Sequence, residues 1–178
     1  MPYRRTEAQP MKNALVTLTV AFLFCSTLMA QDTELSRISL KGLTGFAVVV
    51  EPLDPNAEKD GLSKDQIRTD VELRLRTAGI KVFTERESVS APGVPYLNIM
   101  LNALKSRASK MWVIALEVSL RQGVALTRDP KVVVIGTTWN AAGVAVVGTT
   151  KIAQTRDSIK DLVETFINAW LSVNPKNP

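Results

Sequence analysis

The sequence has no histidine and a single cysteine, Cys25, among its 178 residues. These two absences exclude Ser-His-Asp and Cys-His catalysis, and also zinc sites built from histidine or from several cysteines. No phosphate-binding loop, dinucleotide fingerprint, nucleophile elbow or EF-hand loop is present. Aromatic residues make up only 6% of the chain, yet 46% is hydrophobic, which is too apolar for a disordered protein. We therefore expect a folded protein that is not an enzyme and binds no cofactor or metal.

The N-terminus has the pattern of a secretory signal peptide. Lys12 precedes an uncharged, mostly apolar run, residues 14–30, that ends in small residues. We expect cleavage between Ala30 and Gln31, and a periplasmic or secreted mature protein. Translation can start at either Met1 or Met11, because MKNALVTL has by itself the features of the beginning of a compact signal peptide.

Two other interpretations of this segment fit less well. A membrane-spanning helix needs about 20 apolar residues, and this run is shorter. A lipoprotein needs a small residue before its acylated cysteine, whereas Phe22-Leu23-Phe24 precedes Cys25. Removal of residues 1–30 takes away three basic residues and one acidic one, so the net charge falls from +5 to +3. Such a weakly basic domain gives no reason to expect nucleic-acid binding.

After the signal peptide (1–30) we expect a linker at 31–41, one domain at 42–174 and a tail at 175–178. Residues 45–50 are predicted to be a buried strand, and 52–61 a loop. A helix should begin after Ser63, with Gln66 completing a capping box, and end at Gly79. Its apolar stripe is Ile67, Val71, Leu75 and Ala78. A short strand at 80–83 would complete a right-handed βαβ unit with two parallel strands.

Alternating residues predict two long strands, at 96–103 and 112–121, and a third at 132–139 that can continue to Val147. A loop at 85–95 precedes them. A final amphipathic helix has the apolar positions Ile159, Leu162, Val163, Phe166, Ile167, Trp170 and Leu171. The predicted class is α/β, an α+β two-layer sandwich of order β-α-β-β-β-β-α, with a mixed sheet and both helices on one face. Strand order and oligomeric state are left open.

Three sets of residues are candidates for function. An acidic cluster (Asp54, Glu58, Asp60, Asp65) matches no calcium loop and is explained by the positive end of a helix dipole. A basic turn (Lys105, Arg107, Lys110) could make a peripheral contact with an anionic membrane surface. The helix-free face of the sheet is the leading candidate, because polar groups on a rigid sheet suit recognition. Its candidate partner-binding residues are Tyr96, Asn98, Asn102, Glu117 and Arg121, with Trp139 added as an aromatic expected near a strand end.

Several segments together resemble small exported bacterial α/β domains of undescribed function. They are GFAVVVEPL, RLRTAGIKVF, PYLNIML, VIALEVSLRQGVAL, GTTWN and DLVETFINAWLSVNP. The order of elements over about residues 40–175 also resembles the N-terminal domain of the Tol-system periplasmic protein. Modules of lipopolysaccharide-assembly and curli-secretion lipoproteins are similar too. The resemblance implies envelope assembly and protein partners, supplies no catalytic residue, and rests on fold-level analogy.

These observations favour an exported, non-enzymatic interaction or accessory module of the bacterial cell envelope with an envelope protein as partner. The alternative is a periplasmic protein that binds a small molecule or glycan through Trp139 and the polar face. Thermal stabilisation by a sugar or lipid, without any by a protein, would favour the alternative.

Overall fold

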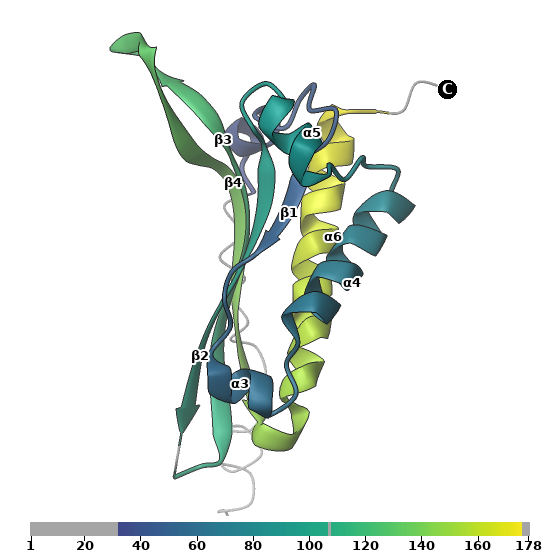
Figure 1. Cartoon of the computed structure of the whole chain (residues 1–178), viewed down its shortest axis with the longest axis vertical. Coiled ribbons are helices and arrows are strands. Elements are labelled where there is room, and N and C mark those ends of the chain that lie inside the picture. Colours follow the sequence, from purple (N-terminus) through teal and green to yellow (C-terminus); the bar gives the residue numbers. More distant parts are fainter. Residues whose placement is uncertain (1–31, 107, 176–178) are drawn as a thin grey trace, which may run out of the picture.

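The computed structural model describes residues 32–106 and 108–175. Its centre is one four-stranded sheet in the order β1-β2-β3-β4, where β1 is Ala47–Val50, β2 Tyr96–Ser106, β3 Met111–Leu126 and β4 Asp129–Gly148. β1 runs parallel to β2, and the other neighbours are antiparallel. Two long helices, α4 (Lys64–Thr77) and α6 (Thr155–Val173), cover one face (Figure 1). This confirms the two-layer sandwich with a mixed sheet. The predicted signal peptide and its cleavage site lie outside the described residues.

Helix α4 begins and ends at the predicted residues. The Ser63 hydroxyl accepts from the Gln66 backbone N–H, and Gly79 follows the helix with a φ of 79°. The predicted capping box is only half present, because the Gln66 side chain accepts from Arg156 Nη1 of α6 at 2.8 Å instead. Arg156 also donates to Asp70, at 2.7 Å from Nη2, so these charged side chains join the outer edges of the two helices.

Helix α6 buries most of its apolar stripe, including Phe166 and Val163, which are fully buried. The Phe166 ring packs edge-on against Phe46 at 5.2 Å and against Trp139 at 5.0 Å between centroids. Trp170 is half-buried at the margin of the core. The core therefore lies between α6, α4 and one face of the sheet. None of the helices in the described part of the chain is both long and apolar enough to cross a membrane.

The structure differs from the expectation in four segments. The short strand at 80–83 is reduced to one parallel bridge between Val82 and Phe46, on the side of the chain away from β2, and the Thr84 cap of the next helix follows it directly. The linker and the two predicted loops each contain a short helix, namely α2 (Glu34–Ile38), α3 (Pro55–Lys59) and α5 (Glu85–Ser90). Each is capped by Thr33, Asp54 or Thr84, whose side chains accept from backbone N–H groups.

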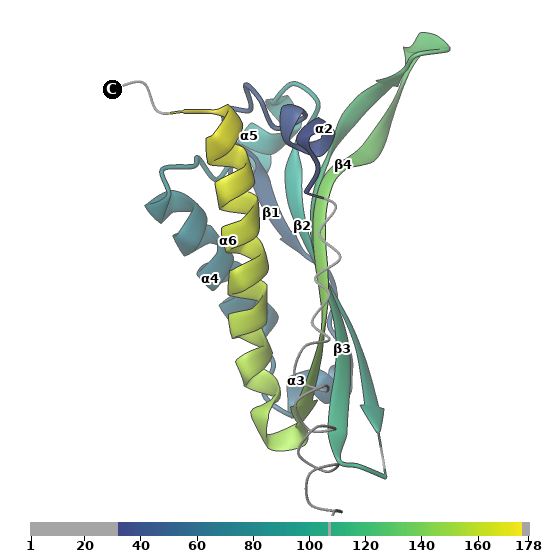
Figure 2. The ribbon, with the colours of Figure 1, turned by 180° about the vertical axis from the view of Figure 1, so that it is seen from behind.

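β4 is one continuous strand through residues 140–143, so the strand predicted at 132–139 does continue to Val147. A bulge at Thr138, between the pairs Leu120–Trp139 and Arg121–Thr137, is the only irregularity near its centre. Beyond the other strands, the last part of β3 and the first part of β4 extend as a two-stranded arm, clearly seen from behind in Figure 2. A 3₁₀ helix, η2 (Thr149–Gln154), then leads into α6.

Candidate functional site

A group of polar side chains joins three strands on the helix-free face. Asn98 of β2 donates from Nδ2 to Glu51 Oε1 at 2.9 Å, and Arg121 Nη1 of β3 lies 3.6 Å from the same oxygen. Glu51 follows β1 directly. We call Glu51, Asn98 and Arg121 the polar cluster. Asn98 and Arg121 lie on one face, as predicted, whereas Glu51 was not among the predicted site residues.

Asn98 was expected to face solvent, and this is wrong. It lies on the predicted face, yet only 1% of it is exposed. The register sets it between Val49 and Ser119, with the larger Tyr96 and Met100 before and after it on the same face. Ser119 is also fully buried, and its hydroxyl has no hydrogen-bond partner within the described ranges. A face without a helix can therefore still bury a polar side chain at the centre of the sheet.

The remaining candidates on this face lie where they were predicted. Tyr96 and Arg121 are cross-strand partners and are both half-buried, as is Glu117 opposite Met100. Asn102, further along β2, is exposed. The face is thus partly closed near Tyr96 and open near Asn102.

Trp139 is the second candidate that the structure corrects. It was placed near a strand end and considered exposed, but β4 continues past it to Gly148, and Trp139 is 1% exposed on the helix side. Its indole N–H donates to Asp32 Oδ1 at 3.1 Å. Since the ring is enclosed by Phe166 and the sheet, Trp139 is a core residue that a partner in solvent cannot reach.

An exposed apolar surface occupies the other half of the helix-free face. Its members are Leu104, Val113, Val144 and Val146, which we call the apolar patch. Val144 is 73% exposed, Leu104 72%, Val146 56% and Val113 41%. Leu104 pairs with Val113 across β2 and β3, and Val113 pairs with Val146 across β3 and β4, so three strands contribute to one surface. The apolar patch was not predicted, although each member lies on the opposite face from the buried stripe of its strand.

The basic turn is partly bound into the fold. Lys105 Nζ contacts Asp60 Oδ2 at 2.7 Å and lies 5.3 Å from the centre of the Trp112 ring. Lys110 is exposed and has a positive φ of 52°. Arg107, the third member, lies outside the described residues. Lys105 therefore has a partner within the protein, and the contact with an anionic surface remains a prediction.

The acidic cluster does not form a site. Asp54 accepts from the backbone N–H groups of Asn56 and Ala57 as the cap of α3. Asp60 accepts from Lys105 and, at 2.9 Å, from the Trp112 indole. No three potential metal ligands come together in the described part of the chain.

The shifted carboxyl groups are all held in the ionised form. The hydrogen bond from Lys105, then that from Trp112, lowers the pKa of Asp60. The hydrogen bond from Arg37 lowers the pKa of Asp32, against burial, with help from Trp139. The pKa of Glu87 falls to about 2, chiefly through its hydrogen bond with Lys81 and then through the Thr84 backbone N–H. A general acid needs the opposite shift.

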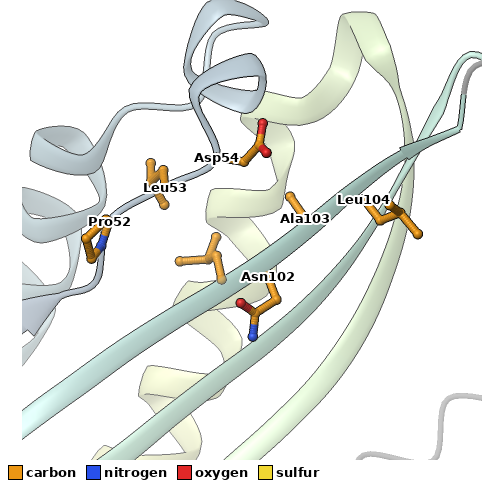
Figure 3. Close-up of a pocket in the computed structure, with 7 residues that line it drawn as sticks. Pro52, Leu53, Asp54, Asn102, Ala103 and Leu104 are labelled. Carbon is orange, nitrogen blue, oxygen red and sulfur yellow. The ribbon is translucent and has the colours of Figure 1, made fainter.

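A pocket of about 340 Å³ lies where the chain leaves β1 and the edge of β2 is uncovered (Figure 3). Pro52, Leu53 and Asp54 form one wall, and residues 101–104 of β2 form the other. Its volume is at the low end for small-molecule sites.

Neither protein-family models nor curated proteins gave a match to this chain.

Proposed function

We propose that this protein is an exported, non-enzymatic interaction module of the bacterial cell envelope, and that the apolar patch is where a partner protein binds. The observation that carries the proposal is the exposure of four large aliphatic side chains on three adjacent strands. Contiguous apolar surface of this kind costs free energy in water and marks interaction sites.

The surroundings of the apolar patch support this proposal. Asn102 and Glu117 border it on the same face, which gives an apolar centre with a polar margin, as in protein interfaces. The sheet beneath is held by continuous ladders from β2 to β4, so the four side chains are presented on a rigid base.

Export is the part of the proposal that rests on the sequence alone. The apolar run before Ala30 supports a mature protein that begins near Gln31. Mass spectrometry of the protein from its native envelope should show this N-terminus. An intact or acylated N-terminus would contradict it.

A matched pair of leucine variants tests the apolar patch. Leu104→Ser removes one member, and Leu73→Ser removes a comparably exposed leucine (62%) from the outer face of α4. Both should change the free energy of unfolding by no more than about 0.5 kcal/mol. Cross-linking in the native envelope, followed by purification, should recover a discrete partner with the wild type and Leu73→Ser but not with Leu104→Ser. Equal recovery with both variants would contradict the proposal.

A second candidate function is binding of a small molecule or glycan, and the pocket beside β2 is the observation that favours it. Here Asn102, rather than the buried Trp139, would supply the polar contact. A sugar or lipid that raises the melting temperature of the wild type, but not that of Asn102→Leu, would support this candidate. The absence of any such ligand, together with patch-dependent partner capture, would favour the first.

A further inference from the structure

The outer edge of β4 is open over residues 140–148. The Thr149 N–H donates to Lys110 O at 3.2 Å, one residue beyond the last pair of the β3–β4 ladder, which sets the alternation of that antiparallel ladder. Odd-numbered residues from 141 to 147 therefore direct their N–H and C=O groups toward β3. Even-numbered residues from 140 to 148 direct theirs away from the sheet. No described residue hydrogen-bonds to these outward groups from Asn140 to Val146, whereas the Gly148 C=O already accepts the first hydrogen bond of η2.

Just before this stretch the edge is closed. Thr138 O, also outward, accepts from the Ser39 hydroxyl beside α2 at 3.2 Å. The open stretch thus begins at Asn140, ends at Gly148 where η2 starts, and is centred on Val144. Figure 2 shows β4 as an outer strand of the sheet, with α2 beside its upper part.

This edge lacks the features that usually prevent pairing with another strand. Natural edge strands carry charges, prolines or strong bulges, or are very short. The β4 sequence has no charged residue and no proline from Val132 to Thr150. The opposite edge of the sheet contrasts with it, since β1 has only four residues and is followed at once by Glu51 and Pro52.

We propose that a second copy of this chain pairs with the open edge, antiparallel, with the two-fold axis at Val144. In that register every outward N–H from Ala142 to Gly148 faces a free outward C=O of the other copy, and the Asn140 N–H faces the Gly148 C=O, which also accepts within η2. Val144 lies beside its own counterpart, Ala142 beside Val146, and Asn140 beside Gly148. Each large side chain thus meets a small one or a β-branched one, and no two charges meet.

The symmetry of the open stretch favours a second copy over an unrelated strand. A two-fold contact uses the same surface on both molecules. The open stretch of β4 is bounded by the Ser39 contact at one end and by η2 at the other, and it is centred on Val144, so two copies of it are complementary when paired antiparallel. The sheet becomes continuous across both molecules, and both apolar patches lie on the same side of it. Strand pairing of this length buries less than a standard interface, so we expect a weak dimer that forms with rising concentration.

This proposal does not depend on the proposed function, because it needs no partner protein. The test is the mass in solution, by light scattering or sedimentation, of the protein produced from its full coding sequence. A monomer at low concentration should convert to a dimer as the concentration rises. A monomer at every concentration would overturn the proposal.

Two variants of Val144 test whether the backbone makes the contact. Val144→Pro removes an outward N–H without removing any bond to β3, and should weaken dimerisation by about tenfold or more through the hydrogen bond lost in each copy. Val144→Thr keeps the N–H and the β-branched shape and should dimerise like the wild type. Equal dimerisation of Val144→Pro and Val144→Thr, with both folded by circular dichroism, would show that the contact lies elsewhere.

A charge pair tests the register without proline. Ala142→Lys with Val146→Lys sets like charges side by side across the two-fold and should give a monomer. Ala142→Asp with Val146→Lys sets opposite charges there and should restore the dimer. Dimers from both double variants, or monomers from both, would exclude this register. Hydrogen exchange of the wild type gives an independent measure, since the amides of Ala142, Val144 and Val146 should gain protection with concentration; unchanged exchange would count against the pairing.

Discussion

At each end of the sheet, a buried tryptophan on the helix side donates its indole N–H to an aspartate that also pairs with a cation. Trp139 donates to Asp32, which accepts from Arg37 Nε at 2.7 Å. At the other end, Trp112 donates to Asp60, which pairs with Lys105. On the helix side, the two ends are thus held by the same kind of contact.

The helix-free side differs between the same two ends. Near β1, the polar cluster satisfies Asn98 internally and leaves it 1% exposed. Near the turn between β2 and β3, the apolar patch leaves Leu104 and Val144 more than 70% exposed. Since both ends are already anchored from the helix side, folding does not require this difference. The comparison therefore assigns a structural role to the polar cluster and leaves the apolar patch as the surface available for binding.

The largest loss of stability should come from a substitution under the helices, at the end of the sheet where β1 lies. Phe166→Ala removes the ring that contacts both Phe46 and Trp139, and should lower the free energy of unfolding by about 3–5 kcal/mol through lost burial and a cavity. Denaturant unfolding measures this loss. Leu73→Ala, at an exposed position of α4, is the control and should change little. A loss below about 1 kcal/mol for Phe166→Ala would mean that α6 does not anchor this end.

Two asparagines of β2 allow the two halves of the helix-free face to be compared, because Asn98 belongs to the polar cluster and Asn102 borders the apolar patch. Asn98→Ala breaks a buried hydrogen bond with Glu51 and should cost about 1–3 kcal/mol. Asn102→Ala, four residues along the same face and exposed, should stay within about 0.5 kcal/mol of the wild type. Denaturant unfolding of both variants is the measurement. Equal costs would show that the two halves do not differ in their contribution to folding.

The faces of the strands could be predicted because the side chains of a strand alternate with a period of two. This pattern placed Leu97 and Leu116 on the buried side, and Asn102 and Glu117 on the other. Helix α4 was predictable for a similar reason, since its Ser63 cap and Gly79 end are local signals. The length of the strand at 80–83 was not, because how far a short apolar run pairs depends on contacts distant in the sequence, and here only Val82 pairs, with Phe46.

The candidate site depended on information between strands, which a single sequence does not carry. The apolar patch exists only because the register sets Leu104 beside Val113 and Val113 beside Val146. The burial of Asn98 likewise depends on Glu51, which belongs to a strand end far away in sequence. Trp139 was misplaced because it was expected near a strand end, whereas β4 continues to Gly148.

Acid should loosen both ends of the sheet slightly, and this is the smallest effect expected. The folded-state pKa values of Asp32 and Asp60 lie below the ordinary value of 3.8. A carboxylate with a lowered pKa stabilises the fold fully above about pH 4, and the contribution is lost as the pH falls below 3.8 through the lowered value. Asp32→Asn and Asp60→Asn should each be less stable than the wild type at neutral pH, and the gap should narrow in acid.

Urea unfolding at a series of pH values, followed by tryptophan fluorescence, measures this gap because Trp139 and Trp112 report on the two ends. Asp161→Asn, on the exposed side of α6, is the control. Its free energy of unfolding should differ from that of the wild type by a small amount that does not change with pH. A gap that narrows for only one of the two aspartate variants would show that the ends are held differently on the helix side as well. The exposed apolar patch would then no longer be the main difference between the two ends, and the requirements of folding could account for its exposure.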